Sequence, residues 1–169
     1  MLHIVNTHEQ FAYALGDRYD ATLRFLDAQQ QMSLQVSNRS FSQLLQLHIA
    51  QTDQQLRSLE QACSLLGVRP GLVSSVSAEG VVIEGRLLVA SAGFNGALRD
   101  SVIASVQTKI INLELSCYRV LVLIAQVIGQ EGVLPLLQKS LLQKEQMARQ
   151  VEQCVPLLLH AAKEQEVGT

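Results

Sequence analysis

A chain of 169 residues, 48% of them hydrophobic and only 17% charged, is long enough to form one domain with a substantial core. Its formal net charge of −2 provides no basic surface for nucleic acid or for an anionic membrane, and the longest uncharged apolar run, residues 120–128, is too short to span a bilayer. Cys63, Cys117 and Cys154 have neither disulfide nor zinc spacing, and the N-terminal residues do not resemble a signal peptide. We therefore expect reduced thiols and a cytoplasmic protein.

The first two predicted helices span residues 8–32 and 41–66. Thr7 with Gln10 forms a capping-box pattern before the first helix, and Ser40 with Gln43 does so before the second, which should end at Gly67. Apolar residues recur at intervals of three or four in both segments, which predicts one inward face on each helix.

Residues 68–96 are the least regular part of the chain, and we interpret them as a long crossover. Arg69, Pro70 and Gly71 predict a turn. Beyond this turn, residues 78–92 could form a further helix that Gly80 and Gly85 interrupt or weaken, whereas a strand could form only at residues 80–83 and would have no partner. The apolar content predicts that this segment packs across the domain.

The third long helix, predicted at residues 98–128, should be the central one, because its second half is apolar nearly all round. Gly132 and Pro135 precede a fourth helix at residues 134–163, which should kink or restart near Pro156. Four long helices with one long connection predict a single all-α domain, residues 1–169, folded as a ferritin-like four-helix bundle.

An internal repeat relates the two halves of the chain. Residues 44–61 align with residues 136–153 at a constant offset of 92, with eight identities in the eighteen positions. A shared bias toward Leu and Gln is the alternative explanation. If the repeat is real, Thr22 is the counterpart of Glu114, and Gln51 is the counterpart of Gln143.

Glu114 is an acidic residue on the apolar face of the central helix. Unless it reaches water at the rim of that face, its carboxylate must find a partner, bind a cation or stay protonated. Ferritin-like metal sites use one Glu on each of two helices and Glu-x-x-His on each of the other two. The chain has no Glu-x-x-His, and uncharged residues stand where the other ligands would lie: Thr22, Gln51, Gln54, Gln143 and Gln146. Amides are poor substitutes for carboxylates on iron or manganese.

Residues 11–26, 48–67 and 97–118 resemble the bacterial YciE/YciF-like stress-response domain, which has a ferritin-like fold. Positions typical of that family are retained at Phe11, Leu15, Asp17, Tyr19, His48, Thr52, Leu59, Glu60, Asp100, Lys109, Glu114 and Tyr118. Other residues replace its usual acids and histidines at Ala14, Thr22, Gln51, Gln55, Ile111, Asn112, Gln143 and Lys144. The resemblance covers roughly residues 5–158. The resemblance implies a ferritin-like fold. It does not imply a metal site, because the replaced residues are the ones that indicate metal binding in that family.

Lys144 lies on the inward line of the fourth helix, close to the position of an acidic pair in the resembled family. We predict a Glu114–Lys144 ion pair as a structural surrogate for the lost metals. In the competing interpretation, Lys144 extends to the surface and Glu114 bonds only to Gln or Tyr. The register is uncertain by one residue, because the inward line of the second helix runs through Thr52 while the repeat points to Gln51. His48 is interpreted as a hydrogen-bonded structural histidine, since no second ligand lies three or four residues away.

These patterns predict a non-catalytic, metal-free module for interaction or structure, without cofactor and linked to stress by the resemblance. Its vestigial central site would comprise Thr22, His48, Gln51, Gln54, Gln55, Glu114, Gln143, Lys144 and Gln146. One alternative is a reduced di-metal site built on Glu114, His48 and the aspartates of the first helix. Another is a small-ligand carrier that uses the former metal cavity. Apolar residues within 72–94 and at the end of the third helix predict a homodimer or larger assembly, besides an unidentified protein partner.

Overall fold

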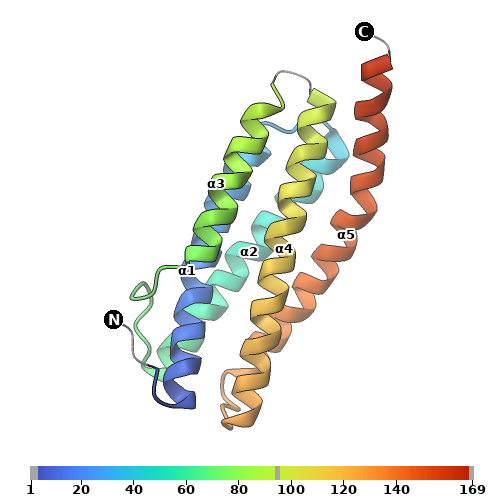
Figure 1. Ribbon diagram of the computed structural model, residues 1–169. Helices are drawn as coiled ribbons and strands as arrows, with labels where there is room; N and C mark the ends of the chain where they lie inside the picture. Colours follow the sequence, from blue (N-terminus) through green and yellow to red (C-terminus); the bar gives the residue numbers. More distant parts are fainter. Residues whose placement is uncertain (1–3, 94–95, 168–169) are drawn as a thin grey trace.

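The computed structural model describes residues 4–93 and 96–167, and five helices account for most of them (Figure 1). Their bounds are α1 Thr7–Ser33, α2 Arg39–Leu66, α3 Val76–Ser91, α4 Gly96–Val127 and α5 Leu134–Val167. No strand occurs in the described ranges, so the predicted all-α class is confirmed. Residues 94 and 95, which belong to the predicted crossover, lie outside those ranges.

The four long helices pack as a bundle in which each helix contacts two others. α1 packs against α2 and α4, and α5 packs against the same two helices from the opposite side. Figure 1 shows that α3 lies beside α1 and α4 over the part of the bundle where α4 begins, and that the connection through α3 returns the chain to that end. A single long crossover between the second and third long helices is the connectivity of ferritin-like bundles.

Asparagines, and not the expected threonine and serine, cap the first two helices. Asn6 Oδ1 accepts a hydrogen bond from the Glu9 backbone N–H at 2.8 Å, and the Glu9 carboxylate accepts one from the Val5 N–H at 2.9 Å. Asn38 likewise accepts from the Phe41 N–H at 3.0 Å. A short amide reaches the free N–H groups of a first turn as well as a hydroxyl does, so both helices begin slightly earlier than predicted.

α3 is one continuous helix, so a strand at residues 80–83 is the wrong interpretation. Neither glycine breaks the helix. Gly80 has open space beside it, whereas a Cβ atom built on Gly85 would lie 2.7 Å from Val106 Cγ1 on α4. Gly85 therefore marks the point of close approach between the two helices, and its lack of a side chain is what permits that contact.

α5 continues through Pro156 and does not restart there, and it extends to Val167, beyond the predicted end. Proline removes one backbone hydrogen bond, which a helix packed along its length can tolerate. Figure 1 shows that α5 changes direction in its C-terminal half. Four residues later, the His160 Nδ1–H donates to the Pro156 carbonyl oxygen at 2.6 Å.

α4 is the most apolar long helix, with a mean hydropathy of 1.6 over its best 18-residue window. Within the described residues it is the one helix long and apolar enough to cross a membrane by length and composition, although the sequence predicted no span. The same composition is expected of a helix enclosed by its neighbours, and α3, α1 and α5 all pack against α4.

Asp100 fixes the turn between α1 and α2 to the first part of α4. Its buried carboxylate accepts hydrogen bonds from the Ser37 N–H at 2.8 Å, the Ser37 hydroxyl at 2.6 Å and the Asn38 N–H at 2.7 Å. Three donors to one carboxyl group form a strong local connection. This connection ties the beginning of α4 to the turn between α1 and α2.

Candidate functional site

A polar layer crosses the middle of the bundle between two apolar clusters. Phe11 and Leu15 belong to the cluster on one side, and Phe25 and Phe41 belong to the cluster on the other. All four long helices contribute side chains to this layer, and each of these side chains is 0% exposed: Arg18 and Thr22 from α1, Thr52 from α2, Glu114 from α4 and Lys144 from α5.

The Glu114 carboxylate lies between two cations. Lys144 Nζ is 2.5 Å from Glu114 Oε2, so the predicted ion pair is present and Lys144 does not extend to the surface. Arg18 Nη2 lies 3.5 Å from the other oxygen, Oε1. The same ammonium donates to the Thr52 hydroxyl at 3.3 Å, so it also contacts α2. With no exposed surface, Glu114 does not reach water at the rim of its face.

Sequence reasoning missed Arg18, although its position carried a signal. Arg18 follows Leu15 and precedes Thr22 and Phe25 at intervals of three and four, so it lies on the inward face of α1. Its guanidinium carbon is 5.6 Å from the centre of the Phe25 ring and 5.7 Å from that of Tyr118, distances at which a cation interacts favourably with an aromatic face. Arg18 Nε donates to the Thr22 hydroxyl at 3.2 Å.

The layer holds two basic groups and one acid, which gives a formal charge of +1 if all three are ionised. Burial lowers the pKa of Lys144, Glu114 acts in the opposite direction, and the nearby Arg18 adds to the lowering. Burial also raises the pKa of the Tyr118 phenol, which keeps it protonated. The balance of charge therefore depends on Lys144, whose ammonium form is the one that this environment disfavours.

His48 forms part of a chain of hydrogen bonds that joins all four long helices. Gln29 on α1 donates to Gln107 Oε1 on α4 at 3.3 Å, and Gln107 Nε2 lies 3.4 Å from His48 Nδ1 on α2. His48 Nε2 lies 3.1 Å from Gln150 Oε1 on α5. Burial lowers the pKa of His48 to about 4, and the Lys144 charge contributes to the lowering. A neutral imidazole that accepts at Nδ1 and donates at Nε2 satisfies both glutamines.

The predicted amide residues divide between the interior and the seam of α2 and α5. Gln55 is 1% exposed and donates to Gln143 Oε1 at 3.1 Å, and Gln143 donates to Gln54 Oε1 at 3.3 Å. Gln51 is half-buried, while Gln54 and Gln146 are exposed. The structure therefore places Thr22, His48, Gln55, Glu114 and Lys144 inside the bundle and places the remaining amides outward along the seam.

Residues separated by 92 positions have the same burial along the inward faces. Thr22 and Glu114 are both fully enclosed, as are Thr52 and Lys144, and Leu59 and Val151 are each 1% exposed. The register through Thr52, and not the one through Gln51, is therefore the inward one. These matches agree with the repeat, and a half-turn rotation that superposes the two helix pairs stays a prediction.

The residues of the layer do not fit a metal ion. Within residues 4–93 and 96–167, no group of three or more His, Cys, Asp and Glu side chains is placed to hold one. Glu114 is the acid at the centre of the layer, and two cations already share its carboxylate. Divalent iron and manganese prefer several carboxylates and imidazoles, so the donor set is wrong in both number and charge.

Residues 6–164 match the family model described as a domain of unknown function, DUF892. The chain belongs to this family. Protein YciF of Escherichia coli K12 is 23% identical over 141 residues, which cover 83% of this chain and 84% of that protein. The expected YciF-like membership is therefore confirmed.

Solved structures share the fold of this DUF892 member. The E. coli stress protein YciF superposes with a TM-score of 0.86 at 20% identity, covering 93% of this chain and 99% of that one. YcfI of Rhodopseudomonas palustris gives a TM-score of 0.84 at 22% identity, covering 88% and 94% of the two chains. At these identities the likeness establishes the helical fold, and the polar layer described above is a statement about this chain.

Proposed function

We propose that this protein is a non-catalytic, metal-free helical bundle that serves as an interaction or structural module, with the Arg18–Glu114–Lys144 centre in place of metal ions. One observation carries the proposal: a single buried carboxylate is shared by an ammonium at 2.5 Å and a guanidinium at 3.5 Å. The three residues come from α1, α4 and α5, so the carboxylate connects three helices as a bridging metal ion would.

Electrostatics make metal binding at this centre unfavourable. A divalent cation that approached Glu114 would meet two positive charges in an enclosed environment of low dielectric constant, where repulsion is strong. It would also have to displace Lys144, which fills the place of a second acid. Thr22 and Gln55 offer only uncharged oxygens nearby. The Lys144 ammonium and the Arg18 guanidinium hold the helices together through Glu114, and this contact does not depend on binding a metal ion from solution.

The alternatives that use this centre lack a supporting observation. A reduced di-metal site would need acids or imidazoles around Glu114, and His48 is already engaged by Gln107 and Gln150. A ligand carrier would need space at the centre, but the side chains of Arg18 and Lys144 occupy it. The cavities found in the described residues are lined by other residues.

The partner is proposed to be a second copy of the chain, another protein or both. Exposed apolar side chains at Val76 (79%) and Leu87 (65%) on α3, and at Leu123 (60%) and Val127 (84%) on α4, remain without cover in the single chain. A role in stress is proposed from the description of the E. coli relative as a stress protein. A cytoplasmic location, without nucleic acid or membrane as partner, belongs to the same proposal. A monomeric mass by light scattering at micromolar concentration would contradict self-association.

Metal analysis tests the central claim. The protein is expressed in medium supplemented with iron and manganese, purified without chelator, and assayed by plasma mass spectrometry. We expect far less than one metal ion per chain and a thermal unfolding midpoint that EDTA does not change. Near-stoichiometric iron or manganese in the wild type would refute the proposal. The variant Lys144→Glu, which places a second acid beside Glu114, shows whether the assay can detect metal at this position.

A further inference from the structure

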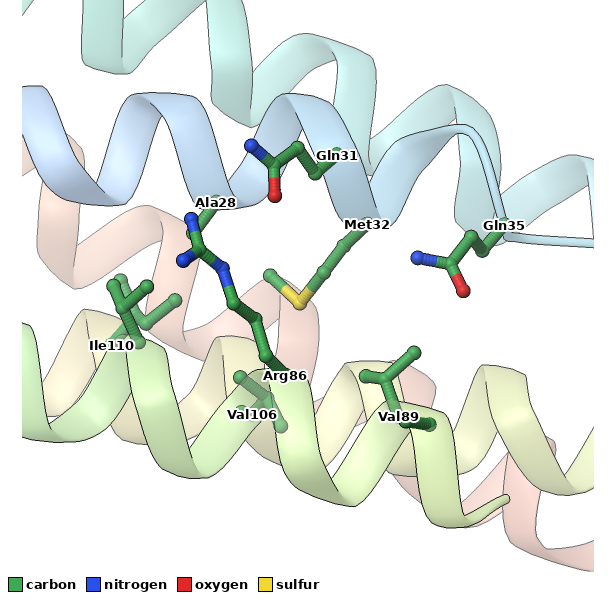
Figure 2. A pocket seen from close by; sticks show the side chains of 11 residues that line it. Ala28, Gln31, Met32, Gln35, Arg86, Val89, Val106 and Ile110 are labelled. Carbon is green, nitrogen blue, oxygen red and sulfur yellow. The ribbon is translucent and has the colours of Figure 1, made fainter. Parts of the chain in front are cut away.

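A cavity of about 230 Å³ lies between α1, α3 and α4, away from the polar layer (Figure 2). We propose that it binds a small molecule with a short apolar body and a carboxylate group. Its deep surface consists of buried apolar side chains from all three helices: Ala28, Met32, Val82, Val89, Val106 and Ile110. Three polar side chains, those of Gln31, Gln35 and Arg86, also line the cavity, and Gly85 and Ala90 of α3 complete the lining. An apolar interior with a few convergent polar groups is the usual character of a small-molecule site.

Helix packing creates the cavity. α3 approaches α4 closely at Gly85, where an added Cβ would lie 2.7 Å from Val106 Cγ1. On the α1 side the wall includes Ala28, whose methyl group is too small to fill the space between the helices. Because the lining comes almost entirely from regular helices, the cavity has a defined shape before any ligand arrives. By proportion to a 150 Å³ cavity that holds benzene, it would accept roughly nine non-hydrogen atoms.

Arg86 determines the expected charge of the ligand. Figure 2 shows its side chain extending from α3 across the cavity toward Ala28 on α1, with the Gln35 amide toward the other end. One guanidinium nitrogen, Nη2, lies 3.3 Å from Asp27 Oδ2, and Gln31 donates to the same oxygen at 2.8 Å. Asp27 does not line the cavity.

The Asp27–Arg86 pair leaves capacity for a second anion. Both side chains are more than half exposed, at 56% and 57%, and pairs this exposed are only weakly held. A guanidinium has five N–H donors in a planar fork, so it can bind a ligand carboxylate while it still contacts Asp27. A ligand amine would meet Arg86 as a like charge, and an alcohol would lose the charge-assisted hydrogen bonds. The expected order of affinity is therefore carboxylate, then alcohol, then amine.

Methyl-labelled NMR titrations with hexanoate, 1-hexanol and hexylamine test this order on the full chain. We expect saturable shifts for hexanoate at the methyl groups of Ala28, Val89 and Ile110, and binding of 1-hexanol about tenfold weaker, since a charge-assisted hydrogen bond is lost. Absence of saturable shifts at the solubility limit would overturn the proposal. So would equal affinity for the three probes, or shifts confined to exposed apolar residues such as Leu23 and Ile83.

Variants separate the charge from the cavity. Arg86→Gln should reduce hexanoate binding to the level of 1-hexanol. Arg57→Gln, which removes another largely exposed Arg–Asp pair, on α2, should leave hexanoate binding unchanged. Ala28→Leu should abolish binding of both probes by filling the space, and Ala90→Phe, at an exposed lining position, should weaken both if Ala28→Leu does not fold. Retained binding in the filled variants would refute the site. The outcome is independent of the metal analysis, because the cavity shares no residue with the polar layer.

Discussion

Removing Glu114 should damage the bundle more than removing either of its cationic partners. Glu114→Gln leaves Arg18 and Lys144 fully enclosed with no acid between them, and loss of one partner from a buried ion pair typically costs about 3–5 kcal/mol. Lys144→Met is milder, because Arg18 still lies 3.5 Å from the carboxylate and the formal charge of the layer falls from +1 to zero. The lost hydrogen bond from the ammonium to Thr52 is worth about 1.5–3 kcal/mol. Methionine recovers part of this by burying an apolar chain in place of an ammonium.

Arg18 also changes what a double variant should do. If only the Glu114–Lys144 pair existed, Glu114→Gln combined with Lys144→Met would recover most of the loss. With Arg18 present, the double variant leaves one buried guanidinium unpaired, so recovery should be incomplete. Adding Arg18→Met should bring the free energy of unfolding close to that of the wild type or above it, because well-packed apolar residues often replace buried ion triads without cost.

Urea unfolding, followed by far-UV circular dichroism, measures these differences without adding salt that would screen the charges. Lys109→Met is a matched control, since Lys109 pairs with Glu84 at 2.6 Å while both side chains are about half exposed, and its loss should cost no more than about 1 kcal/mol. The reasoning is wrong if Glu114→Gln lowers the unfolding midpoint no more than Lys109→Met does. It is also wrong if the double variant recovers fully while Arg18 remains.

Three further outcomes follow from single contacts. Gly85→Ala should lower the free energy of unfolding by about 1–3 kcal/mol, because the new Cβ would clash with Val106. Gly80→Ala, in open space on the same helix, should raise it by up to about 1 kcal/mol. Urea midpoints of the two variants that shift in the same direction would contradict this. Burial lowers the pKa of His48 from 6.5 to about 4, so between these pH values the unfolded chain binds more protons than the folded chain. The free energy of unfolding should therefore fall by about 3 kcal/mol as the pH drops from 6.5 to about 4. His48→Gln should remove this pH dependence. If the stability of the variant and of the wild type falls in parallel with pH, the assignment to His48 is wrong. Asp100→Asn weakens or removes three hydrogen bonds and should lower the free energy of unfolding in urea by about 2–4 kcal/mol. A loss below about 1 kcal/mol would contradict this expectation.

Local patterns in the sequence specify the helical class, the positions of the four long helices and the presence of a buried acid. These features depend on interactions between residues close in the sequence. The spacing of apolar residues indicates the helices, and a glycine in the left-handed conformation, such as Gly67, marks a helix end. The inward placement of Glu114 and Lys144 was also readable, since each interrupts an apolar stripe. Local rules were weaker at helix starts, where Asn6 and Asn38 compete with nearby hydroxyl residues for the same N–H groups.

The Glu114–Lys144 contact was predicted from the sequence and the family resemblance, but the third member of the centre became visible only in the folded chain. Arg18 lay on a recognisable stripe, but its partner is 96 residues away on α4, and no local pattern specifies the axial alignment of two helices. From the sequence, Gly85 was expected to interrupt or weaken the helix, because helix propensity reflects the backbone entropy of glycine and takes no account of tertiary contacts. In the folded chain, its lack of a side chain allows α3 to contact α4. The cavity beside it has the same origin. It exists because three helices pack at a fixed distance over small side chains, and that distance is a property of the assembled bundle and of no single segment.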